Sequence, residues 1–172
     1  MIVLVGFLGA GKTTVGRLLA ARLDLPFRDA DHVLVERQGR SVAEVFAADG
    51  EAAFRTLEHE VVDDLLAGED AVVALGGGAV EHPGTQRSLA ALPVRRPGAE
   101  VVLLEVDLAE ARARVGDDPG RPMLARPDLA AVHARRLPSF ARVASRVVAT
   151  AGRSPAEVAD AVLRAGETGR DA

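Results

Sequence analysis

"VGFLGAGKTT", residues 5–14, follows directly on a short apolar run at residues 2–5. The stretch matches the pattern G-x-x-x-x-G-K-[ST], with Gly6, Gly11, Lys12 and Thr13 at the fixed positions. The apolar run predicts a buried parallel strand, and the apolar positions that follow predict a helix over residues 12–23. A strand, this turn and a helix in that order are typical of a phosphate-binding loop.

The chemistry of this loop follows from its residue types. Glycines let the backbone turn tightly, so that several N–H groups point into one concavity. The helix that begins near Lys12 adds the positive end of its dipole, the lysine can reach the β- and γ-phosphates, and the Thr13 hydroxyl can ligate Mg²⁺. We therefore predict that the phosphates of ATP are bound by Gly9, Ala10, Gly11, Lys12, Thr13 and Thr14.

Lys12 is the only lysine among the 21 basic residues of the chain. A genome whose base composition favours arginine and alanine codons would account for the excess of arginine. It would also make the single lysine more informative, because a compact ammonium fits among phosphates better than the wider guanidinium does.

Length and composition limit the class of protein. The 172 residues, of which 48% are hydrophobic, are enough for one globular domain over residues 1–172. The absence of cysteine excludes disulfides and thiolate metal sites. A net charge of -4 argues against nucleic acid as a partner, and no apolar run approaches the roughly 20 residues that span a bilayer. The first residues lack the layout of a signal peptide, so we expect a cytoplasmic protein. We also expect it to act as a monomer.

Apolar runs alternate with amphipathic stretches along the rest of the chain. Further strands are expected at residues 25–28, 71–75, 101–106 and 147–149. Helices are expected at residues 31–38, behind the capping box at Ser41, at 51–67, behind a cap at Asp107, from about residue 127 with a bend near Pro138, and behind the cap at Ser154. This order predicts an α/β three-layer sandwich, in which a five-stranded parallel sheet carries helices on both faces.

Three segments carry no regular pattern. Residues 116–127 are rich in Gly, Pro, Asp and Arg and are predicted to form a mobile lid, and the tail from residue 166 is predicted to fray. Residues 90–100 are interpreted as a long link into the fourth strand, with Arg95 and Arg96 as solvated loop residues.

Two polar patches follow strands of the predicted sheet, where ligands of such sheets bind. Asp29 and Asp31 follow the second strand, and the triple glycine at residues 76–78 follows the third. Arginines at positions 55, 121 and 136 form a third set. Because a guanidinium fork fits a carboxylate, arginines aimed at this edge would suit an anionic acceptor.

Each of these residues also has an ordinary structural interpretation. Either aspartate could cap a helix, Arg55 could be solvated, and Phe46 and Phe54 could be core residues. Asp107 at the end of the fourth strand is a rival metal ligand to Asp29, but its capping position before Glu110 favours Asp29 for the metal.

Six stretches together resemble the shikimate kinase family, small P-loop kinases of the nucleoside-monophosphate-kinase type. They are "GFLGAGKTTVGRLLA", "FRDAD", "GRSVAEVFAADGEAAFRTLE", "LGGGAV", "RPML" and "ARRLPSFARVA", and they span about residues 3–148. The resemblance implies ATP-dependent phosphorylation of the 3-hydroxyl of shikimate, with Mg²⁺, on the route to chorismate and the aromatic amino acids.

The resemblance also implies roles for individual residues. Asp31 would orient the acceptor hydroxyl or take its proton, Arg55 and Arg136 would hold the acceptor carboxylate, and Arg121 would swing in with the lid to meet the transferred phosphoryl group. Asp29 would lie near Mg²⁺. The acceptor ring would lie against Gly76, Gly77, Gly78, Phe46 and Phe54, and the adenine against Arg114 and Arg153.

Two alternatives remain open. A gluconate-type kinase of the same fold would also bind an anionic polyol, although the "GGGAV" and "FR..E" spacing favours shikimate. A regulatory nucleotide-binding module without transfer activity would not need Asp31, Arg55, Arg121 and Arg136 together. A guanine-reading N-K-x-D motif is absent, because Lys12 is the only lysine.

Overall fold

Five parallel strands form one sheet in the computed structural model, which describes residues 1–115 and 127–167. The strand order is β2-β3-β1-β4-β5, and every neighbouring pair is parallel. This confirms the predicted sheet. Most of the predicted lid, residues 116–126, lies outside the described residues, as do the last residues of the tail. The strands are β1 (Ile2–Val5), β2 (Phe27–Asp29), β3 (Val72–Ala74), β4 (Glu100–Glu105) and β5 (Arg146–Ala149).

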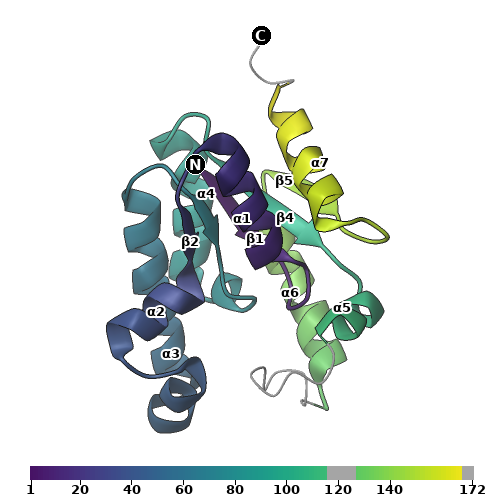
Figure 1. Ribbon diagram of the computed structural model, residues 1–172. Coiled ribbons are helices and arrows are strands. Elements are labelled where there is room, and N and C mark those ends of the chain that lie inside the picture. The colour runs from purple at the N-terminus through teal and green to yellow at the C-terminus, as the bar shows by residue number, and fades with distance from the viewer. Residues whose placement is uncertain (116–126, 168–172) are drawn as a thin grey trace.

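Helices cover both faces of the sheet, which confirms the three-layer architecture (Figure 1). On one face α1 (Lys12–Leu23) lies beside α7 (Pro155–Glu167), and on the other α4 (Pro83–Arg95) lies beside α6 (Leu129–Val143). The remaining helices follow the carboxyl ends of strands or pack beside β2 and α4. They are α2 (Ala30–Gln38), α3 (Val42–Ala67), the 3₁₀ helix η1 (Ala79–Glu81) and α5 (Leu108–Val115). No described helix has the length and apolar character needed to cross a membrane.

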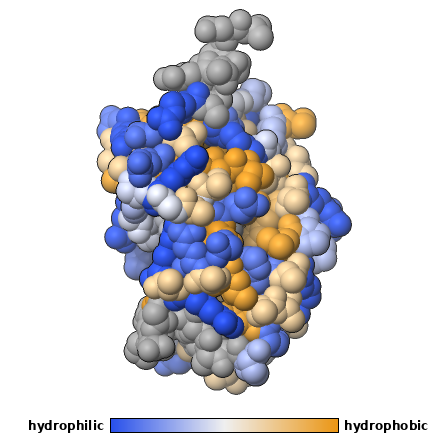
Figure 2. Space-filling view, turned by 90° about the vertical axis from the view of Figure 1, so that its right-hand side faces the viewer, coloured by the Kyte–Doolittle hydropathy of each residue, from blue (hydrophilic) through white to orange (hydrophobic). Residues whose placement is uncertain are grey.

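The centre of the sheet is the core of the molecule. Val3, Val73 and Val102, from the three central strands, are completely buried. These strands are covered on both faces, so their sequences are continuous apolar runs rather than alternating ones. The edge strand β5 is different, with Val147 half exposed. Figure 2 shows the side of the molecule where α5 and α7 lie, and there hydrophobic and hydrophilic residues are interspersed.

Local capping chemistry sets several helix ends as predicted. The Ser41 hydroxyl accepts from the Glu44 N–H (3.2 Å) while the Glu44 carboxylate accepts from the Ser41 N–H (2.7 Å), which confirms the capping box. The two helices predicted on either side of residue 50 are joined in α3, where Gly50 leaves helical geometry (φ 81°, ψ 169°). The element is therefore two helical pieces that meet at a glycine.

The second strand was predicted two residues too early in the chain. It runs over Phe27–Asp29 and not over residues 25–28. Asp24 closes α1 in the left-handed conformation (φ 52°), and the Leu25 N–H donates to the Ala20 carbonyl (3.0 Å). Leu25 therefore belongs to the end of the helix, because its N–H is used there and not in the sheet.

The interpretation of residues 90–100 as a link was also wrong. The first half of this segment is the end of α4, which continues through Pro93 to Arg95. Arg96 is not a solvated loop residue, because its guanidinium donates to the Asp70 carboxylate (2.8 Å) and to the carbonyls of Ala67 and Gly68. Arg96 thereby satisfies carbonyl groups at the end of α3, which needs partners for them.

Candidate active site

The phosphate loop lies at the carboxyl end of β1 and leads into α1. Gly11 is the N-cap of this helix, in the left-handed conformation (φ 88°), and offers no capping side chain. The first N–H groups of the helix are therefore left for a ligand. The Lys12 ammonium donates to the carbonyls of Gly6 (2.8 Å) and Phe7 (3.1 Å), so it lies against the same loop.

Two oxygen-bearing side chains next to this loop fit a magnesium ion. The Thr13 hydroxyl donates to the Asp29 carboxylate (2.9 Å). A hydroxyl and a carboxylate are hard oxygen ligands of the kind that Mg²⁺ prefers, with substrate phosphates and water completing the shell. The described residues contain no group of three or more His, Asp or Glu side chains that could hold a metal ion.

Two of the aspartates are helix caps in the structure. Asp29 is the N-cap of α2 and accepts from the Asp31 N–H (3.2 Å), so one carboxylate serves both the helix and the Thr13 hydroxyl. Asp107 accepts from the Glu110 N–H (2.7 Å), which confirms the predicted cap of α5.

One wall of the acceptor side comes from α3. The rings of Phe46 and Phe54 lie 4.3 Å apart between centroids, and the Arg55 guanidinium lies over both, at 5.8 and 5.2 Å. Arg55 Nη1 also donates to Glu58 Oε2 (2.6 Å). The Arg55 side chain is only 14% exposed, so it is a packed residue and not a solvated one.

The triple glycine after β3 lets these side chains approach the backbone. A Cβ atom on Gly76 would lie 2.4 Å from Glu58 Oε1 and 2.6 Å from Asp31 Oδ1. A Cβ on Gly78 would lie 2.2 Å from Arg55 Nη2. The glycines therefore bring Asp31, Glu58 and Arg55 together around one loop.

Arg136 reaches the same region from α6, on the opposite side. It is 2% exposed, and its Nε and Nη2 atoms donate to Glu81 Oε2 at 2.9 and 2.6 Å. Arg55 Nη2 lies 3.8 Å from the same oxygen. The fold thus directs Arg55 and Arg136, which are far apart in sequence, at one carboxylate.

The sequence analysis gave no role to Glu58, although this residue ends the "FR..E" spacing, and it did not single out Glu81. Glu58 follows Arg55 by three residues, a spacing that predicts side-chain contact on a helix and could have identified it. Glu58 is 2% exposed, and burial raises its pKa to about 7 although the Arg55 charge opposes this; the nearby Asp31 carboxylate raises it further. No sequence signal marks Glu81, because it joins Arg136 only through the fold.

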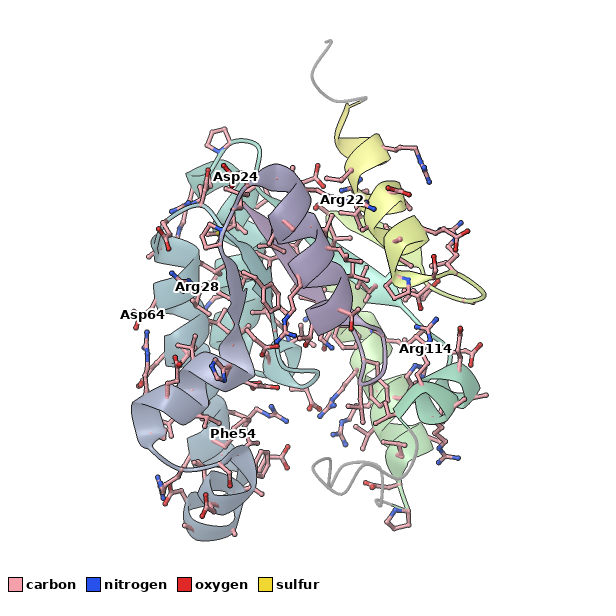
Figure 3. The ribbon with its side chains drawn as sticks, in the orientation of Figure 1. Arg22, Asp24, Arg28, Phe54, Asp64 and Arg114 are labelled. Atoms are coloured by element: carbon pink, nitrogen blue, oxygen red, sulfur yellow. The ribbon has the colours of Figure 1, made fainter. Side chains whose placement is uncertain are left out.

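Arg114, a residue predicted for the adenine side, lies well apart from Phe54 in Figure 3, and its Nη1 donates to the Gly9 carbonyl of the phosphate loop (3.4 Å). Arg114 donates to the Thr150 hydroxyl (2.9 Å), the Thr150 carbonyl (2.7 Å) and Glu110 (2.6 Å). Arg153 donates to the Ala149 carbonyl (3.2 Å). Both arginines therefore border the segment between β5 and α7. Arg121 lies outside the described residues.

Comparison with known proteins identifies the family of this chain. The model of the family described as "Shikimate kinase" matches residues 8–167. The chain belongs to the shikimate kinase family. The shikimate kinase of Streptomyces coelicolor is 46% identical over 170 residues, which cover 97% of this chain and 95% of that protein.

Solved structures place the fold in the same family. The shikimate kinase from Acinetobacter baumannii in complex with shikimate has a TM-score of 0.91 and 30% identity, and the match covers 99% of this chain and 94% of that one. A gluconokinase from Sinorhizobium meliloti has a TM-score of 0.61 and 19% identity over 97% of this chain and 91% of that one, a likeness of fold alone.

Proposed function

We propose that this member of the shikimate kinase family transfers the γ-phosphoryl group of ATP to the 3-hydroxyl of shikimate. The products are ADP and shikimate 3-phosphate, on the route to chorismate. The observation that carries the proposal is the approach of Arg55 and Arg136 to one carboxylate oxygen, with Nη2 atoms 3.8 and 2.6 Å from Glu81 Oε2. Such a pair suits an acceptor that carries a carboxylate.

On the donor side, the amides at the start of α1 and the Lys12 ammonium would hold the β- and γ-phosphates. Mg²⁺, held by Thr13 with Asp29 nearby, would neutralise part of the phosphate charge. Arg114 and Arg153 would line the adenine side, and Arg121 would meet the transferred group. Phosphoryl transfer depends mainly on positioning and charge stabilisation, which these groups supply.

On the acceptor side, Arg55 and Arg136 would bind the carboxylate and so fix the orientation of the ring. Asp31 lies beside Gly76 and would hold the attacking hydroxyl by accepting its hydrogen bond. The ring would pack against the glycine loop and the wall formed by Phe46 and Phe54. That the protein is a cytoplasmic monomer remains a prediction.

A coupled assay with ATP and Mg²⁺ tests the proposal, with shikimate and gluconate as alternative acceptors. We expect ADP release that requires shikimate, and we expect the 3-phosphate as product by phosphorus NMR. Turnover of gluconate without turnover of shikimate would move the assignment to a gluconate-type kinase of the same fold. ATP binding without turnover of either acceptor would indicate a nucleotide-binding module.

A further inference from the structure

The Glu81 carboxylate occupies the place where the two acceptor-binding arginines converge. Its Oε2 atom accepts from both Nε (2.9 Å) and Nη2 (2.6 Å) of Arg136 and lies 3.8 Å from Arg55 Nη2. The Nε and Nη2 atoms form the edge that a guanidinium normally offers to a carboxylate. That edge of Arg136 is therefore already covered by a group of the chain itself.

A second arginine holds the other oxygen of the same carboxylate. Arg135 donates to Glu81 Oε1 from Nε (3.2 Å) and Nη2 (2.9 Å). The two arginines differ in exposure, since the Arg135 side chain is 61% exposed and that of Arg136 is 3% exposed. Glu81 thus bridges a buried guanidinium of the site and an exposed one outside it.

The position of Glu81 allows it to move between these partners. It is the last residue of the one-turn helix η1, and its side chain is 21% exposed. Its Oε1 atom already accepts from the exposed Arg135. Glu81 can therefore leave Arg136 while Arg135 keeps it partnered, which avoids a lone carboxylate.

Glu81 is ionised when the site is empty. Burial raises the pKa of its carboxyl, but the hydrogen bonds and charges of Arg136 and Arg135 outweigh burial, and the net pKa lies below the usual value. An anion therefore competes with the incoming anion for the same cation at neutral pH.

We infer that Glu81 is a built-in competitor for the acceptor carboxylate: it covers Arg136 in the empty site and moves onto Arg135 when the acceptor binds. The inference rests on the proposed function, since it presupposes an acceptor carboxylate on Arg55 and Arg136. Glu81 would lower acceptor affinity and keep the buried Arg136 charge neutralised between turnovers, because a buried unpaired cation is costly.

The test compares Glu81→Gln with Glu51→Gln in the ATP- and shikimate-dependent assay. Glu51 pairs with Arg55 from the exposed side (3.4 Å), so its substitution removes the same charge near the pocket but leaves the Arg136 edge covered. We expect Glu81→Gln to lower the KM for shikimate roughly three- to tenfold, with kcat and the KM for ATP little changed. For Glu51→Gln we expect a change of less than about twofold.

The neutral methyl ester of shikimate supplies the second arm of the test. It lacks the charge that would displace Glu81, so its binding, measured by calorimetry, should not improve in Glu81→Gln. Two results would overturn the inference. One is a raised or unchanged KM for shikimate in Glu81→Gln, which would make Glu81 a positioning residue for Arg136 or a bystander. The other is an equally large fall in the KM for shikimate in Glu51→Gln, which would show that the effect comes only from the loss of a negative charge near the pocket.

Substitution of Arg135 provides an independent measurement. Arg135→Gln removes the alternative partner, so Glu81 should stay on Arg136 and the KM for shikimate should rise. In the Glu81→Gln background the same change should have a clearly smaller effect; equal effects in both backgrounds would contradict the inference. If the unmodified chain does not turn over shikimate at all, the proposed function fails and not this inference alone.

Discussion

Lys12 is the one ammonium side chain of the sequence, and it lies against the carbonyls of Gly6 and Phe7. Both of these acceptors are backbone carbonyls of the loop, so the site fits a small cation at the end of a flexible stem. A guanidinium is wider and planar and would not enter the loop in the same way. This is the physical reason why a chain so rich in arginine keeps a lysine here.

We predict that Lys12→Arg lowers kcat at least about a hundredfold, since a misplaced cation loses contacts to the charge that develops in transfer. Lys12→Ala should abolish measurable transfer. Thermal unfolding of both variants should match that of the unmodified chain, because Lys12 does not belong to the core. A kcat of Lys12→Arg within a few-fold of the original would contradict the assignment.

Arg136 is the buried cation of the acceptor side. Arg136→Ala should raise the KM for shikimate about a hundredfold, since the loss of a partner for a largely buried charge costs several kcal/mol. The KM for ATP should stay nearly constant. Arg142→Ala on the same helix is the matched control, because the Arg142 guanidinium donates to the Gln86 side chain (3.2 Å) in an exposed contact. An unchanged KM for shikimate in Arg136→Ala would refute its role.

The glycine loop after β3 shows how an element can place side chains that belong to others. Gly78 has φ -110°, which any residue can adopt, so its lack of a side chain serves space and not conformation. The space is filled by the Arg55 guanidinium, 2.2 Å from where a Cβ would be. The requirement for glycine at this position is therefore steric.

We predict that Gly78→Ala displaces the Arg55 guanidinium and raises the KM for shikimate by about tenfold, a cost typical of one lost charge-assisted contact. The fold should survive, because the atoms in the way are the end of a flexible side chain. The check is a pair of titrations, one of shikimate and one of ATP. Equal changes in both KM values would show a general disturbance of the site instead.

At the level of elements, the sequence predicted those whose signals are local. The phosphate loop, the Ser41 capping box and the Asp107 cap depend on residues within a few positions of each other. The start of β2 was wrong and α4 was not predicted at all. Leu25 looks like a strand residue until the end of α1 takes its N–H, and part of the segment interpreted as a link belongs to α4, which continues to Arg95.

At the level of the whole molecule, the acceptor side is assembled from distant segments. Arg55, Glu81 and Arg136 come from α3, η1 and α6, and the parallel sheet brings these elements to one edge. The resemblance to the family implied a role for the arginines, but it did not mark the carboxylate between them. Such a contact depends on tertiary packing and leaves no local pattern in the sequence.

The buried Glu58 connects the site with the stability of the whole chain. Its pKa rises from 4.5 to about 7 on burial. The folded chain therefore binds more protons than the unfolded chain between these values, so this group stabilises the fold fully below about pH 4.5 and loses its contribution as pH rises through about 7.

We predict that Glu58→Gln flattens the pH dependence of unfolding. Between pH 5 and 8 the unmodified chain should lose about 2 kcal/mol more stability than the variant. Urea denaturation of both proteins at the two pH values measures this difference. Parallel pH dependences would show that Glu58 titrates normally despite its burial.

The most direct measurement of the central claim is a structure of the chain with a non-hydrolysable ATP analogue, Mg²⁺ and shikimate. The account predicts the terminal phosphate on the amides at the start of α1 and on Lys12, and the shikimate carboxylate between Arg55 and Arg136. The 3-hydroxyl should face both Asp31 and that phosphate. A shikimate ring bound elsewhere, with Arg55 and Arg136 making no contact to its carboxylate, would contradict the account.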